Sequence, residues 1–71
     1  MITKTDLLEN GFNPYFDENE NDWTIDFDRV MFDLKEQILY DFCEYTGKKV
    51  KLSTIRDVEE LKEIVYLYFK I

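Results

Sequence analysis

The stretch VMFDLKEQILYDFCEYTGKKVKLSTI, residues 30–55, decides the fold of this 71-residue chain. It is the longest apolar-rich segment, and its periodicity fits two different secondary structures. As a pair of β-hairpins, it makes the protein a small sheet flanked by helices. With a helix over residues 29–46, it makes the protein mainly helical.

The helical interpretation rests on the distribution of polar residues. Wound as a helix, residues 30–45 gather most of their polar side chains on one side, and only Lys35 interrupts the apolar arc. These polar residues are Asp33, Glu36, Gln37, Asp41 and Glu44. However, aspartate is a poor residue for a helix interior, and the segment is rich in β-branched and aromatic residues.

The strand interpretation rests on alternation of apolar and polar residues. One face is expected to carry Val30, Phe32, Leu34, Ile38, Tyr40 and Phe42. A turn at residues 35–37 would lack the Gly or Asn that tight hairpins prefer. Thr46-Gly47-Lys48 offers a glycine for a second turn, and residues 49–53 alternate again. We therefore predict a hairpin from Leu39 to Leu52 and favour the sheet.

The segments on either side carry clearer signals. A short helix is expected from about Thr5, with Thr3 or Thr5 as its N-cap and Gly11 after its end. Asn13-Pro14 then stops the helix. Residues 23–28 alternate strictly, with Trp23, Ile25 and Phe27 on one face and Thr24, Asp26 and Asp28 on the other, which is typical of a half-buried strand.

A second helix is predicted from Asp57, its N-cap, to about Phe69, because Glu60 stands at the capping-box spacing. Its expected apolar stripe consists of Val58, Leu61, Ile64, Val65, Tyr68 and Phe69. Tyr66 and Leu67 fall on its polar side. The prediction is a single α+β domain, residues 1–71, with an N-terminal short helix, an antiparallel sheet of three or four strands and a C-terminal helix packed on the sheet.

The charge is unevenly distributed along the chain. Residues 1–46 hold twelve acidic residues against three basic ones, a net charge of −9, and residues 47–71 hold four against six, a net charge of +2. An acidic surface repels phosphate, so direct nucleic-acid binding is not expected, whereas a basic protein surface would be attracted.

Composition also restricts compartment and chemistry. There is no histidine, and Cys43 is the single cysteine, which fits a reducing cytosol and a small core residue. No signal peptide or membrane-spanning segment is expected, so we predict a cytoplasmic protein in a bacterium or an infected host cell. Without histidine, neither Ser53 nor Cys43 can be activated by an imidazole base, and we expect no enzyme activity and no cofactor.

One string resembles an EF-hand calcium loop: Asp17, Asn19 and Asn21 followed by Asp28 at the twelfth position. It departs from that pattern at the sixth position, where Asp22 replaces glycine, and at the twelfth, where Asp replaces the longer Glu. A solvated acidic loop is the better interpretation, and a weak calcium-binding module is kept as an alternative.

The acidic segment itself is the candidate partner-binding surface. Glu20, Asp22, Asp26 and Asp28 would present negative charge to a nucleic-acid-binding enzyme, with Trp23 as an aromatic anchor. Tyr66 and Leu67 suggest a second contact surface. A basic patch, formed by Lys48, Lys49, Lys51 and Arg56, is expected to guard an exposed edge strand against pairing.

Two short segments, Leu7-Leu8-Glu9-Asn10-Gly11-Phe12 and Asp57-Val58-Glu59-Glu60-Leu61-Lys62, resemble small acidic proteins of unknown function from phages and mobile elements. The resemblance implies an α+β element order and a phage-like origin. Phage proteins of this size and acidity include inhibitors of host defence enzymes, anti-CRISPR proteins among them.

We therefore expect a small acidic, non-enzymatic binding protein that occupies a basic surface of a protein partner, such as a host defence nuclease inhibited by nucleic-acid mimicry. The alternative is a self-associating structural or accessory protein, a homodimer for example, in which the +2 part of one copy meets the −9 part of another.

Overall fold

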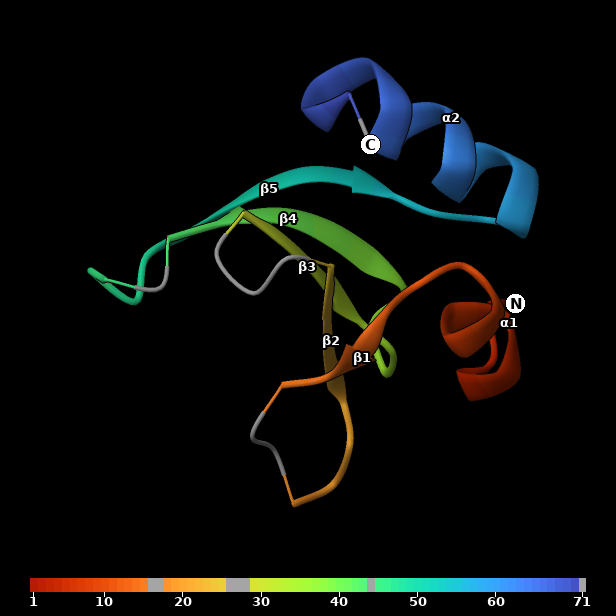
Figure 1. The fold of residues 1–71 in the computed structure, drawn as a ribbon, viewed down its shortest axis with the longest axis horizontal. Coiled ribbons are helices and arrows are strands. Elements are labelled where there is room, and N and C mark those ends of the chain that lie inside the picture. Colours follow the sequence, from red (N-terminus) through yellow and green to blue (C-terminus); the bar gives the residue numbers. More distant parts are fainter. Residues whose placement is uncertain (16–17, 26–28, 44, 71) are drawn as a thin grey trace.

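The computed structural model describes residues 1–15, 18–25, 29–43 and 45–70, and it has an α+β fold (Figure 1). A short helix, α1 (Lys4–Glu9), comes first and a longer helix, α2 (Val58–Phe69), comes last. Between them lies a five-stranded antiparallel sheet whose strands follow one another in chain order. They are β1 (Asn13–Pro14), β2 (Asp22–Ile25), β3 (Val30–Asp33), β4 (Ile38–Phe42) and β5 (Lys49–Thr54). The α+β prediction is confirmed, with five strands instead of three or four.

Residues 30–55 form strands β3, β4 and β5 and not the alternative central helix. Phe32 lies opposite Trp23 on one side and Leu39 on the other, and all three side chains are buried. Every residue of β3 is buried, so this strand is covered on both faces. A surface helix would bury only one stripe of this segment and would leave its other apolar residues in solvent. A central strand buries both of its faces, so the apolar composition of the segment favours a strand.

One detail of the strand prediction was wrong. Ile38, Tyr40 and Phe42 do not share a face with Phe32, because Leu39 is the residue opposite Phe32. The cause is the turn over residues 34–37. The Asp33 carboxylate accepts a hydrogen bond from the Glu36 N–H at 2.8 Å, and Gln37 adopts the left-handed conformation (φ 59°) that Gly or Asn would otherwise supply.

The second hairpin has the predicted turn. Gly47 has φ 71° and donates its N–H to the Cys43 carbonyl at 2.8 Å, while the Cys43 N–H donates to the Lys48 carbonyl at 2.9 Å. The hairpin from Leu39 to Leu52 is therefore confirmed. Cys43 itself is exposed, so the expectation that it is a small core residue was wrong.

Both helices pack on the same face of the sheet, which carries the main core. Leu7 of α1 and Leu61, Val65 and Phe69 of α2 contribute to this core. The expected stripe of α2 is narrower than predicted, because Tyr68 is 58% exposed. The three buried residues are spaced four apart, and the partly buried Val58 and Ile64 pack against the same core, so only Tyr68 of the predicted stripe is left in solvent.

The caps of α1 explain how so short a helix is held. Thr3 is the N-cap and forms a reciprocal capping box with Asp6. At the other end, the Phe12 N–H donates to the Leu7 carbonyl at 2.9 Å and the Gly11 N–H donates to the Leu8 carbonyl at 3.2 Å. This Schellman arrangement, with Gly11 at φ 84°, directs Phe12 into the core beside Leu7.

The opposite face of the sheet holds a second, smaller apolar group. Met31 and Phe42 are buried there, and the Tyr15 ring packs edge-on against Phe42 with 5.3 Å between ring centroids. Thr24 lies opposite Met31 and is 1% exposed, so it is not on a solvated face as predicted. The strict alternation of residues 23–28 predicts one solvent-exposed face, but both faces of β2 are covered at this point.

Candidate functional site

Carboxylates gather at the end of the sheet where β1 joins β2 and β3 joins β4. We call this group the acidic end; its described members are Glu18, Glu20, Asp22, Asp33 and Glu36. Asp22 and Asp33 are directly opposite each other on neighbouring strands, an arrangement that like charges disfavour. The acidic end therefore needs a specific structure to hold it together.

Asn21 supplies that structure. Its side-chain amide donates to Asp33 at 3.1 Å and to Asp22 at 3.4 Å, so one NH₂ group bridges both carboxylates. Its side-chain oxygen accepts from the Lys35 N–H and its main-chain carbonyl accepts from the Leu34 N–H, each at 2.8 Å. The loop before β2 is thereby fastened to the β3–β4 turn, which holds the two aspartates in one geometry.

Trp23 has a different role from the one predicted. It was expected to be an aromatic anchor for a partner, but its ring is 1% exposed in the main core. Its indole N–H donates to the Glu20 carbonyl at 2.6 Å, which fixes the backbone of the acidic end from inside. Glu20 is exposed, adopts φ 50° and forms a 3.3 Å ion pair with Lys4. Trp23 therefore orients the acidic end and does not belong to a contact surface.

The other predicted acids, Asp26 and Asp28, lie outside the described residues, as does Asp17. The calcium-loop interpretation depends on two of these positions. In the described part of that loop, the Asn21 oxygen already accepts the Lys35 N–H and the residues from Asp22 to Ile25 form a strand. Among the described residues, no group of His, Cys, Asp or Glu side chains could hold a metal ion.

The second predicted surface, on α2, is exposed. Tyr66, Leu67 and Tyr68 form what we call the tyrosine patch, and they are 60%, 56% and 58% exposed. The Lys70 amine stands 5.5 Å from the centre of the Tyr66 ring. Aromatic residues are enriched in protein interfaces relative to the rest of the surface. Sequence reasoning missed Tyr68, because helical periodicity assigned it to the buried stripe.

The structure does not bring the two predicted surfaces together. The Arg29 guanidinium lies 5.6 Å from the Phe69 ring centre, which places the end of α2 beside the start of β3. Asp33, opposite Asp22, is at the other end of β3. The acidic end and the tyrosine patch are therefore separated by the length of that strand, and Figure 1 shows residues 18–21, which precede β2, far from the end of α2.

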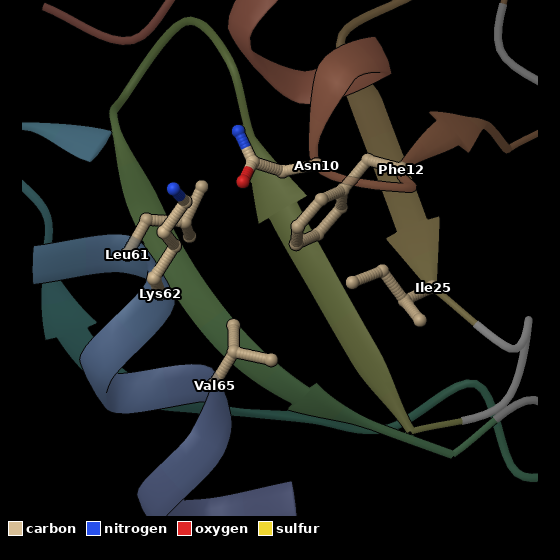
Figure 2. A pocket seen from close by; sticks show the side chains of 6 residues that line it. All are labelled: Asn10, Phe12, Ile25, Leu61, Lys62 and Val65. Atoms are coloured by element: carbon tan, nitrogen blue, oxygen red, sulfur yellow. The ribbon is translucent and has the colours of Figure 1, made fainter. Parts of the chain in front are cut away.

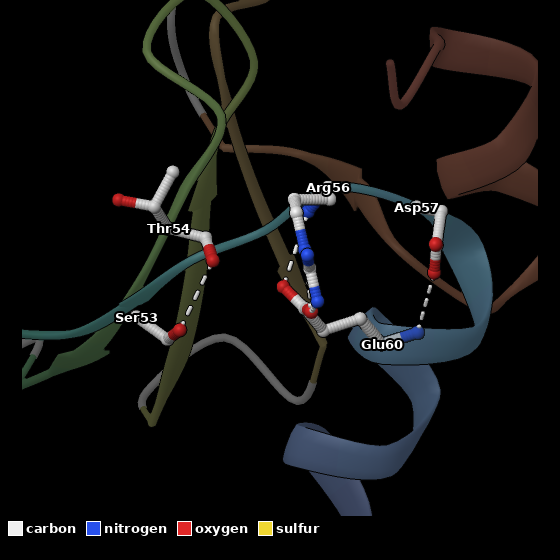
Figure 3. Close-up of polar contacts among 5 residues, drawn as sticks. All are labelled: Ser53, Thr54, Arg56, Asp57 and Glu60. Atoms are coloured by element: carbon white, nitrogen blue, oxygen red, sulfur yellow. Dashed lines mark hydrogen bonds and ion pairs between the residues drawn. The ribbon is translucent and has the colours of Figure 1, made fainter.

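The basic patch is also divided. Lys48, Lys49 and Lys51 are exposed on or beside β5, the last strand of the sheet, and we call them the lysine edge. Arg56 instead turns toward α2, where its guanidinium donates to Glu60 at 3.0 and 3.1 Å (Figure 3). Its N–H also donates to the Glu60 carboxylate, while the Glu60 N–H donates to Asp57. Arg56 is therefore part of the helix cap, not of the lysine edge.

A pocket of about 230 Å³ lies between the helices and β2. Figure 2 shows the residues that line it: Asn10, Phe12, Ile25, Leu61, Lys62 and Val65. Three of them are core residues that are at most 5% exposed, so the walls are apolar and offer little surface to a ligand. The volume is below the roughly 300 Å³ at which ligand pockets begin. Its remaining polar groups, Asn10 and Lys62, do not form an acid–base pair.

Comparisons with known proteins give no relative for this chain. No family model, no curated protein and no solved structure matches it. No helix among the described residues has the length and apolar composition to cross a membrane. The acidic end, the lysine edge and the tyrosine patch are thus the candidate contact surfaces among the described residues.

Proposed function

We propose that this protein is a non-enzymatic binding protein whose acidic end occupies a basic surface of a protein partner. The observation that carries the proposal is the Asn21 bridge between the Asp22 and Asp33 carboxylates. Holding two like charges opposite each other costs stability, and a solvated loop does not need such an arrangement. Asp33 is buried and therefore positions Asp22 without facing a partner itself; a carboxylate held in place, as Asp22 is, suits a fixed group of cations because less side-chain freedom is lost on binding.

The finer proposal concerns the partner class. A rigid patch of carboxylates competes with phosphates for the same arginines and lysines, so a nucleic-acid-binding enzyme fits the acidic end. Inhibition of a host defence nuclease, in the manner of an anti-CRISPR protein, is the corresponding biological role.

Charge-reversal variants test this proposal with a matched control. Glu18→Lys/Glu20→Lys alters the acidic end, and Glu59→Lys/Glu63→Lys changes the net charge equally on the exposed side of α2. Each immobilised protein is used to capture partners from host lysate at low and high salt. We expect wild type and the α2 variant to retain the same basic protein, the acidic-end variant to lose it, and high salt or added duplex DNA to release it.

Two outcomes would contradict the proposal. If both variants retain the partner equally, the acidic end is not the contact surface. If retention by wild type is unchanged between low and high salt, charge does not drive the association. If high salt releases the captured partner and duplex DNA does not, charge-driven binding is supported and nucleic-acid mimicry is excluded.

A second candidate function is self-association. The acidic end lies where β3 meets β4, whereas Lys48, in the turn between β4 and β5, and Lys49, the first residue of β5, lie at the opposite end of β4. One copy could therefore place its lysine edge against the acidic end of another. Light scattering across a salt series distinguishes the candidates, because self-association predicts a particle mass that falls as salt rises and a monomer at every salt concentration would exclude it.

A further inference from the structure

The two edges of the sheet differ in how they are protected. β1 has two residues and one of them is Pro14, which cannot donate a hydrogen bond. β5 has six residues, the most of any strand in the described part of the chain, and contains neither Pro nor Gly. Lys49, Val50 and Lys51 are all exposed, with Val50 at 64%. Short, proline-containing edges resist pairing, whereas a longer exposed edge is a template for an added strand.

The backbone of β5 offers hydrogen-bonding groups to such a strand. The Phe42 N–H donates to the Arg29 carbonyl at 2.9 Å, so Phe42 turns its polar groups toward β3 and away from β5. Lys49 lies opposite Phe42, and Lys51 lies opposite Tyr40, two residues before Phe42. In an antiparallel ladder these are non-hydrogen-bonded pairs, and the N–H and C=O of Lys49 and Lys51 therefore point outward.

The side chains of β5 define what could pair with it. Lys49 and Lys51 lie on the side of the sheet without helices, where the Lys49 amine stands 4.6 Å from the Tyr40 ring centre. Val50 lies on the other side, opposite Asp41. The register irregularity between Leu39 and Tyr40 limits the regular edge to the first part of β5.

We propose that the first part of β5 is a docking edge for an extended peptide segment in which acidic and apolar residues alternate. The acidic side chains would lie beside Lys49 and Lys51 and the apolar one beside Val50, while the outward groups of Lys49 and Lys51 supply the main-chain hydrogen bonds. A second copy of β5 is a poor occupant, because it would bring the two lysine edges together. The net charge of −7 does not prevent docking at physiological salt, where the Debye length is about 8 Å and the nearby lysines dominate.

The test uses a capped peptide of about eight residues, a common strand length, in which Asp alternates with Val. A peptide in which Lys alternates with Val is the control. Amide hydrogen exchange, followed by NMR, distinguishes strand addition from loose charge attraction. We expect the Asp–Val peptide to slow exchange at Lys49 and Lys51 while Val50, which already bonds to β4, is unchanged, and we expect the Lys–Val peptide to have no effect.

Two variants make the result specific. Lys51→Pro removes one outward N–H without touching the ladder to β4, and it should abolish the protection. The Lys49→Glu/Lys51→Glu variant should bind the Asp–Val peptide about tenfold more weakly than wild type does, and it should bind the Lys–Val peptide instead. Lys62→Glu, on exposed α2, is the control for a charge change elsewhere and should bind as wild type does.

Three results would overturn the proposal. One is the absence of protection at millimolar peptide. Another is a set of small chemical-shift changes at the amides of every lysine that high salt abolishes and that persist in the Lys51→Pro variant. The third is protection of Lys49 and Lys51 at high protein concentration without any peptide, which would make a second copy the occupant. Because the docking edge is remote from the acidic end, failure here leaves the outcome of the acidic-end capture experiment unchanged.

Discussion

At the scale of single residues, Gln37 connects more segments than any pattern in the sequence suggested. Its side-chain oxygen accepts from the Ile2 N–H at 2.7 Å, and its side-chain amide donates to the Ile2 carbonyl at 3.1 Å and to the Leu34 carbonyl at 2.8 Å. Its own carbonyl accepts from the Ile55 N–H. One turn residue thus ties the N-terminus, the β3–β4 turn and the end of β5 together.

We predict that Gln37→Ala lowers the free energy of unfolding by about 1–3 kcal/mol, because the partly buried main chain of Ile2 loses both its partners. Urea denaturation measures this change. Lys35→Ala, an exposed substitution in the same turn, should cost less than about 0.5 kcal/mol. Equal stability of the two variants would show that the bonds to Ile2 contribute nothing in solution.

Thr24 leads to a prediction of the opposite sign. Its hydroxyl oxygen is buried and has no hydrogen-bond partner among the described residues. Thr24→Val replaces that hydroxyl with a methyl group of similar size and should stabilise the protein by about 1 kcal/mol. Thr24→Ser, which keeps the hydroxyl and loses the methyl, should be less stable than wild type. Thermal denaturation of the three proteins decides, and a destabilised Thr24→Val would show that the hydroxyl is bonded in solution.

At the scale of elements, α2 depends on its N-terminal cap. Asp57 accepts the Glu60 N–H at 2.9 Å, and Glu60 in turn accepts the Arg56 N–H at 3.2 Å (Figure 3). Two acids, Glu59 and Glu60, lie in the first turn, where negative charge is favourable to the helix dipole. Lys70 ends the helix in the left-handed conformation.

We expect Asp57→Ala to cost about 1 kcal/mol in the free energy of unfolding, the usual effect of a lost N-cap. Asp57→Asn keeps an acceptor oxygen and should recover most of that loss. Glu63→Ala, at an exposed position within the helix, is the control and should be within about 0.5 kcal/mol of wild type. If Asp57→Ala matched Glu63→Ala, the cap would not contribute to stability.

At the scale of the whole molecule, the charge of −7 is confined to a body of 29 × 27 × 19 Å. At about 10 mM salt the Debye length is about 30 Å, so nearly every carboxylate repels every other. Raising the salt to about 0.5 M screens most of this repulsion. The folded state should gain more from screening than the expanded unfolded chain does.

We therefore predict that the melting temperature rises by a few degrees between about 10 mM and about 0.5 M NaCl, as measured by circular dichroism. Glu18→Gln/Glu36→Gln, which removes two exposed charges from the acidic end, should reduce this rise. A melting temperature that falls with salt in wild type would mean that attractive pairs, such as Lys4–Glu20, outweigh the repulsion.

The surfaces were only partly predictable. The exposure of Tyr66 and Leu67 and the position of the lysines on an edge strand follow from helical and strand periodicity, and both are confirmed. The burial of Trp23 agrees with its place on the apolar face of the alternating segment, whereas the burial of Thr24 on the other face could not be predicted, because alternation does not show that both faces are covered. The separation of the acidic end from the tyrosine patch depends on where α2 ends relative to β3, which is a property of the packing.

The sequence alone determined the N-cap of the second helix at Asp57 and the glycine that ends the first helix, Gly11, because helix caps depend on neighbours within a few residues. Only the tertiary structure decided which strand faces are covered: β3 is buried on both faces, and Asn21, twelve residues away in the chain, donates to the Asp33 carboxylate, because these contacts form between segments that are distant in sequence. Residues 30–55 were ambiguous for the same reason: their apolar residues suit two local structures, and burial on both faces of β3 selects the sheet.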